Sequence, residues 1–366
     1  MRVTIIGPAF PLRGGIAHHV YYLDRELAQR GHTVQIISFR KLYPKLLFPG
    51  STVFDSSSAG LDPKATPILS SLNPISWAHA VRSIKAFSPD VILFQWWHSF
   101  FAPMIGSVAR ALRRQGARLV LECHNVFPHE RSRFDTSLLK FAADPIDYFI
   151  THSRKDREDL QAVLPKKTVK VCPLPVPEEF AGGLNSDRAG QTILFFGTVR
   201  KYKGLDLLLE AMPKVLSQVG CRLLVAGEFY EPVEKYQALI SRLKLDSHVS
   251  IDNRYIPNEE LPEVFDQADV LVLPYRNATQ SAVARIALSN ALPVIASQTG
   301  GLAEVVKENE NGLLFPANDA DELADRLITY FTRGLGPKFA KNIKADSRPQ
   351  TQEIAETIES IANDQT

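Results

Sequence analysis

Short apolar runs recur along the chain, and each is separated from the next by a stretch with the periodicity of a helix. The runs are apolar throughout instead of alternating with polar residues, as strands covered on both faces should be. Strands joined by helices form parallel sheets with right-handed crossovers, and such sheets bind ligands at the carboxyl ends of their strands. We therefore expect parallel strands at residues 3–6, 33–38, 91–94, 118–123, 148–151 and 169–172, and again at 192–196, 222–226, 249–252, 269–274, 293–296 and 313–315.

The length of 366 residues suits two domains of roughly 170 residues each. Residues 172–191 break the pattern with proline, glycine and polar residues, which is typical of a linker. One amphipathic segment near residues 354–361 is either a helix packed back on the N-terminal domain or part of a loosely ordered tail. The expected organisation is an N-terminal Rossmann-like domain (1–175), a linker (176–191), a C-terminal Rossmann-like domain (192–335) and a C-terminal tail (336–366).

The composition excludes several classes of protein. Basic and acidic residues nearly cancel (42 against 40), whereas a dedicated nucleic-acid binder is usually more lopsided, so no nucleic-acid partner is expected. No apolar stretch approaches the roughly 18 residues that a membrane-spanning helix needs, and the first residues lack the apolar core of a signal peptide. The three cysteines lack metal-ligand spacing, so reduced thiols and a cytoplasmic location are expected.

Two glycines, Gly14 and Gly15, follow the first predicted strand and lead directly into a helical stretch. They allow backbone N–H groups to approach an anion at the positive end of the helix dipole. A tight turn would need the same glycines. The dinucleotide fingerprint G-x-G-x-x-G does not occur here, which counts against a dehydrogenase.

Two further strand-to-helix loops in the second half could hold phosphate. Arg200, Lys201 and Lys203 follow the strand at 192–196, and like charges this close repel one another unless they are solvated or face an anion. Residues 275–281 follow the strand at 269–274, and Ser281 could cap the next helix or bind phosphate with Gln280. Surface charge and simple capping are the structural alternatives, but three such loops at strand ends favour a phosphate site.

Three blocks of the second half read FFGTVRKYKGLDLLLEAMPKV, ADVLVLPYRNATQSAVARIALSNALPVIASQTGGLAEVV and NGLLFPANDADELADRL. In order and spacing they resemble the retaining glycosyltransferases of family 4, a resemblance that runs from Met1 to about Tyr330. It implies the GT-B fold, in which two Rossmann-like domains face each other across a cleft that holds a nucleotide-sugar donor. It also implies that Arg200 and Lys203 neutralise the donor diphosphate, although the family arginine usually follows the glycine directly and Thr198 stands there instead.

The chain departs from the family at the two glutamates that normally contact the donor sugar and ribose. These positions fall on Ala278 and Ile286, whose side chains accept no hydrogen bond. The residues between them, usually Gly-Phe-Gly, are Thr279, Gln280 and Ser281, which still offer polar groups to a phosphate. This pattern favours a divergent subgroup over an inactive relative.

A histidine, His124, follows the strand at 118–123 and so should lie at its carboxyl end. The resemblance implies that it contacts the reacting sugar, and the alternative is a histidine that neighbouring side chains satisfy. His18, His19 and His98 are further candidates for lining a cleft.

No metal site and no cofactor besides the nucleotide sugar are expected. The one Asp-x-Asp sequence, at Asp319 and Asp321, follows a predicted strand and suits helix capping better. Arg200, Lys203 and helix dipoles would then carry the charge of the leaving diphosphate. No carboxylate nucleophile can be assigned, and the resemblance implies a retaining transfer in which the leaving phosphate helps to deprotonate the acceptor.

Residues 39–49 mix basic and large apolar side chains. They form either an ordinary loop or a peripheral contact with the inner face of a membrane, which would suit a lipid-linked acceptor. The expected function is transfer of a sugar from a nucleotide-diphosphate donor to a glycan or lipid-linked acceptor hydroxyl, in the synthesis of cell-surface polysaccharide or glycolipid. A sugar-nucleotide epimerase on a similar scaffold and an inactive nucleotide-sugar-binding relative remain the alternatives.

Overall fold

The structure is a computed structural model of the whole chain. It describes residues 1–43, 54–55, 57, 64–128, 132–174, 191–278, 280–345 and 351–364. The described residues up to Leu174, except Ser57, form a first compact unit together with the helix after residue 350. Residues 191–345 form a second unit with Ser57.

The first unit is built on a seven-stranded sheet of order β3-β2-β1-β4-β5-β6-β7, in which every neighbouring pair is parallel. Its strands are β1 (Arg2–Ile6), β2 (Thr33–Lys41), β3 (Thr66–Ser70), β4 (Val91–Trp96), β5 (Arg118–Cys123), β6 (Tyr148–Thr151) and β7 (Thr168–Val171). Its helices are α1 (Gly15–Gln29), α2 (Pro74–Phe87), the 3₁₀ turn η2 (Ser99–Phe101), α3 (Ala102–Leu112), α4 (Asp135–Ala143), α5 (Arg154–Val163) and α13 (Thr351–Ala362).

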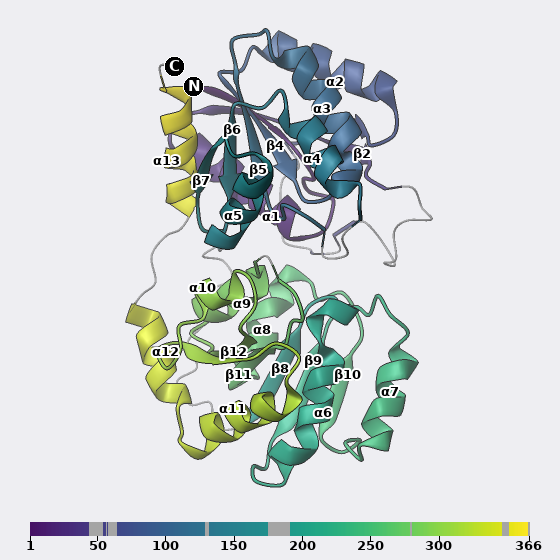
Figure 1. Cartoon of the computed structure of the whole chain (residues 1–366), viewed down its shortest axis with the longest axis vertical. Coiled ribbons are helices and arrows are strands. Elements are labelled where there is room, and N and C mark those ends of the chain that lie inside the picture. Colours follow the sequence, from purple (N-terminus) through teal and green to yellow (C-terminus); the bar gives the residue numbers. More distant parts are fainter. Residues whose placement is uncertain are drawn as a thin grey trace. The chain divides into compact units, whose positions relative to one another are not determined.

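Helices cover both faces of this sheet, as Figure 1 shows. Alternate residues of β1 enter two different cores: Val3 and Ile5 pack with α1 and α13, whereas Ile6 packs with α2, α3 and α4. Both faces of the strand are therefore apolar, which explains why its sequence lacks the alternation of a half-exposed strand.

The second unit has a six-stranded parallel sheet of order β10-β9-β8-β11-β12-β13. Its strands are β8 (Thr192–Phe196), β9 (Arg222–Ala226), β10 (Val249–Asp252), β11 (Val270–Leu273), β12 (Val294–Ser297) and β13 (Gly312–Phe315). Its helices are η4 (Lys201–Lys203), α6 (Leu205–Leu216), α7 (Val233–Arg242), η5 (Asn258–Glu260), α8 (Leu261–Asp266), α9 (Ala282–Ser289), α10 (Leu302–Val305), α11 (Ala320–Thr332) and α12 (Gly336–Ala345).

The expectation of two Rossmann-like parallel sheets is confirmed, with one strand that the sequence analysis did not include. The strand β3 lies at the edge of its sheet and pairs only with β2, where the register shifts twice. Pro67 lies within it, and an edge strand tolerates proline because one row of its backbone groups needs no ladder partner. In both sheets the strand order reverses next to the first strand, between β1 and β4 and between β8 and β11. Ligands of such folds bind outside the strand ends at that reversal.

The residues after 335 form two helices that belong to different units. Phe339 of α12 packs in the core of the second unit. The helix α13 packs against α1 in the first unit, where Ile354, Ile358 and Ile361 are fully buried. Arg30 at the end of α1 also pairs with Glu356 and Glu359 of α13, at 3.0 and 3.1 Å. A docked helix and a loose tail are the two alternatives that the sequence predicts for this segment.

None of the described helices is long and apolar enough to cross a membrane.

Candidate functional site

The loop after β8 packs directly on the end of β11. Gly204, between η4 and α6, has a φ of 69°, and a Cβ placed on it would lie 2.1 Å from the carbonyl oxygen of Pro274. Only glycine fits both the backbone conformation and this close approach. The arrangement brings two of the predicted phosphate loops side by side at the point where the strand order reverses.

Arg276 fixes these two loops to each other. Its backbone N–H donates to the carbonyl of Tyr202 at 2.7 Å, and its guanidinium binds both carboxylate oxygens of Asp206 at 2.8 and 3.1 Å. A two-pronged arginine–carboxylate contact of this kind is strong and directional. The charge of Arg276 is therefore engaged inside the unit, and Arg276 holds the loops in place.

Lys203 differs from the other cations of this loop because it is buried, with 6% of its surface exposed. Its ammonium lies 5.6 Å from the centre of the Tyr275 ring, and it has no carboxylate within ion-pair distance in the part of the chain that the structure describes. Burial, and then the nearby charge of Arg200, lower the pKa of Lys203 to about 8. A buried cation that lacks an acidic partner at a strand's carboxyl end is a candidate for binding an anion.

The other predicted donor residues have more varied surroundings. Arg200 is exposed and stacks over the ring of Tyr230, 4.7 Å from its centre. Ser281 caps α9, because its Oγ accepts the N–H of Ala284 at 3.2 Å. Gln280 precedes it and is partly exposed, whereas Thr279 lies outside the described residues. The structure thus places Lys203 near the Tyr275 ring and Ser281 at the start of α9.

Gly14 and Gly15 belong to the first unit, whereas the loops after β8 and β11 belong to the second. Gly14 precedes α1 with a φ of 116°, and a Cβ on either glycine would meet open space. The left-handed backbone at Gly14 accounts for a glycine there, which is the tight-turn alternative of the sequence analysis. Gly15 opens the helix, so its N–H lies at the positive end of the helix dipole.

The binding of a diphosphate at Lys203 should depend on pH. In the unliganded protein the ammonium loses its proton as the pH rises through about 8, and only the charged form attracts the anion. We expect nucleoside-diphosphate affinity to be constant below about pH 7 and to fall by up to about tenfold per pH unit above 8, with proton uptake on binding. Calorimetry in buffers of different ionisation enthalpy measures both quantities. Lys203→Arg, which stays charged, should flatten the profile, and a flat wild-type profile to pH 9.5 would contradict this role.

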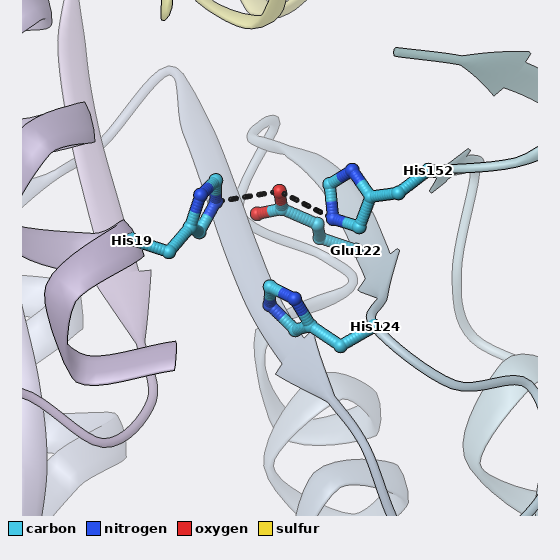
Figure 2. A group of neighbouring side chains, drawn as sticks. All are labelled: His19, Glu122, His124 and His152. Atoms are coloured by element: carbon cyan, nitrogen blue, oxygen red, sulfur yellow. Dashed lines mark ion pairs between the residues drawn. The ribbon is translucent and has the colours of Figure 1, made fainter. Parts of the chain in front are cut away.

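The predicted sugar-contacting histidine lies in a cluster at the carboxyl ends of β5 and β6 in the first unit. His19 comes from α1, Glu122 from β5, and His124 and His152 follow β5 and β6 directly. One ligand atom from each residue lies within 4.8 Å of those from the other three, and all four side chains are almost completely buried. Figure 2 shows His19 and His152 on either side of the Glu122 carboxylate, with His124 beside it.

The buried carboxylate of Glu122 is the centre of this cluster. Its Oε1 lies 2.7 Å from Nε2 of His19 and 3.3 Å from Nε2 of His152, and its Oε2 accepts the amide of Gln95 at 2.6 Å. Burial alone would raise the pKa of Glu122, but His19 and His152 outweigh it and hold that pKa well below its usual value. Glu122 is therefore a buried carboxylate ion.

His124 is linked to this carboxylate through Gln95. Its Nε2 lies 2.5 Å from the amide oxygen of Gln95, and because that oxygen only accepts, Nε2 carries the proton. Burial, and then the neighbouring His152, hold the pKa of His124 well below its usual value. His124 is thus a neutral imidazole whose orientation is fixed by its partner.

The remaining candidate residues have structural partners. His98 caps η2, since its Nδ1 accepts the N–H of Phe100, and His18 pairs with Asp55 at 3.3 Å. The prediction that Asp319 caps a helix is confirmed, because its Oδ1 accepts the N–H of Glu322 at 2.9 Å. Glu122, His152 and Gln95 were not singled out from the sequence. The sequence did show that each of them lies at the carboxyl end of a predicted strand, as His124 does.

Solved structures share this fold along the whole chain. A structure described as Anabaena Alr3699/HepE in complex with UDP superposes with a TM-score of 0.78 at 18% identity, covering 98% of this chain and 100% of that one. Sucrose-phosphate synthase from Thermosynechococcus elongatus superposes with a TM-score of 0.73 at 19% identity, covering 99% and 96%. At these identities the likeness shows the fold.

Two family models match the sequence, one on each unit. The model described as "Glycosyltransferase Family 4" matches residues 13–180, and the model described as "Glycosyl transferases group 1" matches residues 190–333. The chain is a GT-B glycosyltransferase.

Two relatives show how far the similarity to this glycosyltransferase extends. D-inositol 3-phosphate glycosyltransferase of Corynebacterium efficiens is 33% identical over 146 residues, a match that covers 38% of this chain and 34% of that protein. The protein of the same name from Frankia alni is 26% identical over 353 residues, covering 86% and 85%. The match of higher identity thus spans about a third of its relative, and the match along nearly the full length has lower identity.

Proposed function

We propose that this glycosyltransferase transfers a sugar from a nucleotide-diphosphate donor to an acceptor hydroxyl with retention of configuration, and that Lys203 holds the donor diphosphate. The observation that carries the proposal is the buried ammonium of Lys203 after β8, which has no carboxylate partner among the residues that the structure describes. A structural neighbour was solved with UDP, which supports a nucleoside diphosphate as the ligand class.

The leaving group of such a transfer is a nucleoside diphosphate, so negative charge develops on its terminal phosphate as the sugar bond breaks. Lys203 would stabilise that charge from a fixed, dehydrated position, where an ion interacts more strongly than it does in water. Arg200, exposed beside Tyr230, would add a second positive charge at the rim. The loop after β11 would supply polar groups from Thr279, Gln280 and Ser281. The first unit would supply the backbone N–H groups of Gly14 and Gly15.

His124 is proposed to contact the transferring sugar from the first unit. Its neutral imidazole is held in one orientation by the Gln95 amide, which suits a defined contact with a sugar hydroxyl. The leaving phosphate would then serve as the base for the acceptor, which is consistent with a retaining transfer that lacks a protein nucleophile. Ala278 is buried and Ile286 is partly buried, which supports a divergent subgroup without the paired glutamates.

The acceptor is proposed to be a glycan or a lipid-linked glycan, in the synthesis of cell-surface polysaccharide or glycolipid at the inner face of the membrane. The segment at residues 39–49 supports this only in part. Its first residues, Phe39 to Lys41, end β2, and Phe39 is buried against Trp97 and Phe101 instead of facing outward. Arg40 and Lys41 are exposed and could meet anionic headgroups, and residues 44–49 lie outside the described part of the chain.

The apolar residues at Ala278 and Ile286 favour one other function, a protein that binds a nucleotide sugar without turning it over. A thermal-shift screen against UDP, GDP, ADP, CMP and TDP derivatives would first identify the donor, because a ligand that binds only the folded state raises its stability. The stabilising donor is then incubated with and without acceptor glycans. Transfer that requires acceptor supports the proposal. Donor binding without turnover would support the binding protein, and donor isomerisation without acceptor would support an epimerase.

Diphosphate binding through Lys203 and Arg200 is proposed to need no metal ion. We therefore expect that adding EDTA to the assay leaves nucleoside-diphosphate affinity unchanged and transfer essentially intact. Affinity is measured by calorimetry and transfer by product formation, each with and without EDTA. Loss of either with recovery in magnesium or manganese would contradict this proposal, since those ions prefer oxygen ligands such as a diphosphate.

A further inference from the structure

The cluster around Glu122 contains polar atoms that are buried without hydrogen bonds. Nε2 of His19, Oε1 of Glu122 and Nε2 of His152 are all inaccessible to solvent, and apart from their ion-pair contacts none of them has a hydrogen-bond partner in the described part of the chain. The exposed fractions of the three residues are 4%, 0% and 3%. Leaving even one buried polar atom unpaired costs about 1–3 kcal/mol. Three such atoms close together indicate that a ligand binds between them.

Bonds to groups outside the cluster turn the remaining ligand atoms toward one another. His152 donates from Nδ1 to the carbonyl oxygen of Cys172 at 2.9 Å, which leaves Nε2 as the nitrogen that faces Glu122. Gln95 binds Oε2 of Glu122 and leaves Oε1 to face the histidines. Metal-ligating histidines and carboxylates are oriented by outer hydrogen bonds of this kind.

Nε2 of His152 lies 3.3 Å from Oε1 of Glu122 with no hydrogen bond between them. A shared proton would require an N–H that points at the oxygen. Nε2 of His19 lies only 2.7 Å from Oε1 of Glu122, yet neither this nitrogen nor Nε2 of His152 forms a hydrogen bond with that oxygen. Ligands of one metal ion do not point at one another, because they point at the ion.

We propose that His19, Glu122 and His152 bind a divalent transition-metal ion, with Zn²⁺ as the best fit. Two imidazole nitrogens and one carboxylate oxygen are ligands that zinc takes together, and imidazole also suits iron, nickel and copper. Ligands about 2 Å from a tetrahedral zinc ion lie about 3.3 Å from each other, within the 2.7 to 4.8 Å spread of the cluster. His124 belongs to the same cluster, but its Nε2 is bound to Gln95.

The ion would join α1 to two neighbouring strands of the sheet in the first unit. His19 lies in the second turn of α1, Glu122 is the residue before the last of β5, and His152 directly follows β6. It would fix the start of α1, and with it the loop of Gly14 and Gly15, against the carboxyl ends of the sheet. Because its ligands are buried, the ion exchanges slowly, and a short exposure to EDTA does not remove it.

The test is the metal content of the purified protein, before and after dialysis against zinc, measured by inductively coupled plasma mass spectrometry. We expect about one zinc ion per chain, and less than about a tenth of that in His19→Gln, Glu122→Gln and His152→Gln. The matched control is His18→Gln, which removes the adjacent histidine of the same helix and should retain the ion. Far-UV circular dichroism shows whether each variant is folded.

A second measurement decides the proposal on the wild-type protein alone, whether or not the variants fold. Prolonged treatment with a strong chelator should lower the melting temperature, one equivalent of Zn²⁺ should restore it, and Co²⁺ should give the visible absorption of a four-coordinate ion. Wild-type protein that takes up no stoichiometric zinc, or Glu122→Gln protein that binds as much as wild type, would overturn the site. Nucleoside-diphosphate affinity, measured on the same samples, reports on the Lys203 loop, so each proposal can fail separately.

Discussion

Replacing His124 with alanine should lower kcat by roughly ten- to a thousandfold and leave nucleoside-diphosphate affinity nearly unchanged. The reason is that the two residues are proposed to bind different parts of the donor, His124 the sugar and Lys203 the diphosphate. His124 belongs to the first unit, whereas Lys203 and its loops belong to the second. A hydrogen bond to the sugar that strengthens in the transition state contributes to turnover and little to the binding of the nucleotide. Steady-state kinetics and calorimetry on one purified variant measure the two effects.

A structural histidine would give the opposite pattern. Loss of its bond to Gln95 would then lower the melting temperature, while the folded fraction would turn over at a normal rate. His98→Ala is the matched control, because His98 also follows a strand of this sheet and its side chain caps η2. Normal kcat in folded His124→Ala protein would end the assignment of this residue to the sugar.

Lys203→Ala should weaken nucleoside-diphosphate binding by about 1.5–3 kcal/mol, the range for hydrogen bonds to charged groups. The fold should persist, because removing a buried cation without an acidic partner leaves no carboxylate unpaired. The stability of the unliganded variant could even rise, since the native protein must bury this charge. Calorimetric titration with the nucleotide that the thermal-shift screen identifies gives the affinity.

Lys201→Ala is the control for this measurement. Lys201 lies two residues earlier in the same loop and carries the same charge, but its side chain is exposed. Removing an exposed charge should change affinity only slightly, and the effect should vanish at high salt. Equal losses in the two variants would mean that the loop attracts the nucleotide by its general charge, and an unchanged affinity in Lys203→Ala would remove that residue from the site.

Most strands could be predicted from the sequence because a buried parallel strand has a local signature, an apolar run without alternation. The one strand left out, β3, lacks that signature. It lies at the sheet edge, contains Pro67, and has only Leu69 fully buried. Its formation depends on pairing with β2, which is a contact between distant parts of the chain. Edge strands of this kind are defined by their partner more than by their own residues.

The two parts of the candidate site differed in how far local sequence could reveal them. Lys203 stands out as one of three close cations, but its burial arises from Gly204 and the end of β11, seventy residues later along the chain. The cluster of His19, Glu122 and His152 has no local spacing at all, since parallel strands and a helix bring its members together. Their common position near strand ends was visible, but their convergence on one carboxylate depends on the order of β4, β5 and β6.

The return of α13 to the first unit has a consequence for synthesis. The core formed by β1 and α1 is completed by Ile354, Ile358 and Ile361, which are translated only after the entire second unit. Chains generally fold from the N-terminus as they emerge from the ribosome. Here the first unit cannot complete its core at that stage, so the apolar surface of β1 and α1 that α13 covers stays exposed while the second unit is synthesised. The second unit, whose described residues are continuous in sequence apart from Ser57 and Thr279, can fold earlier. The order of completion is therefore the reverse of the order of synthesis.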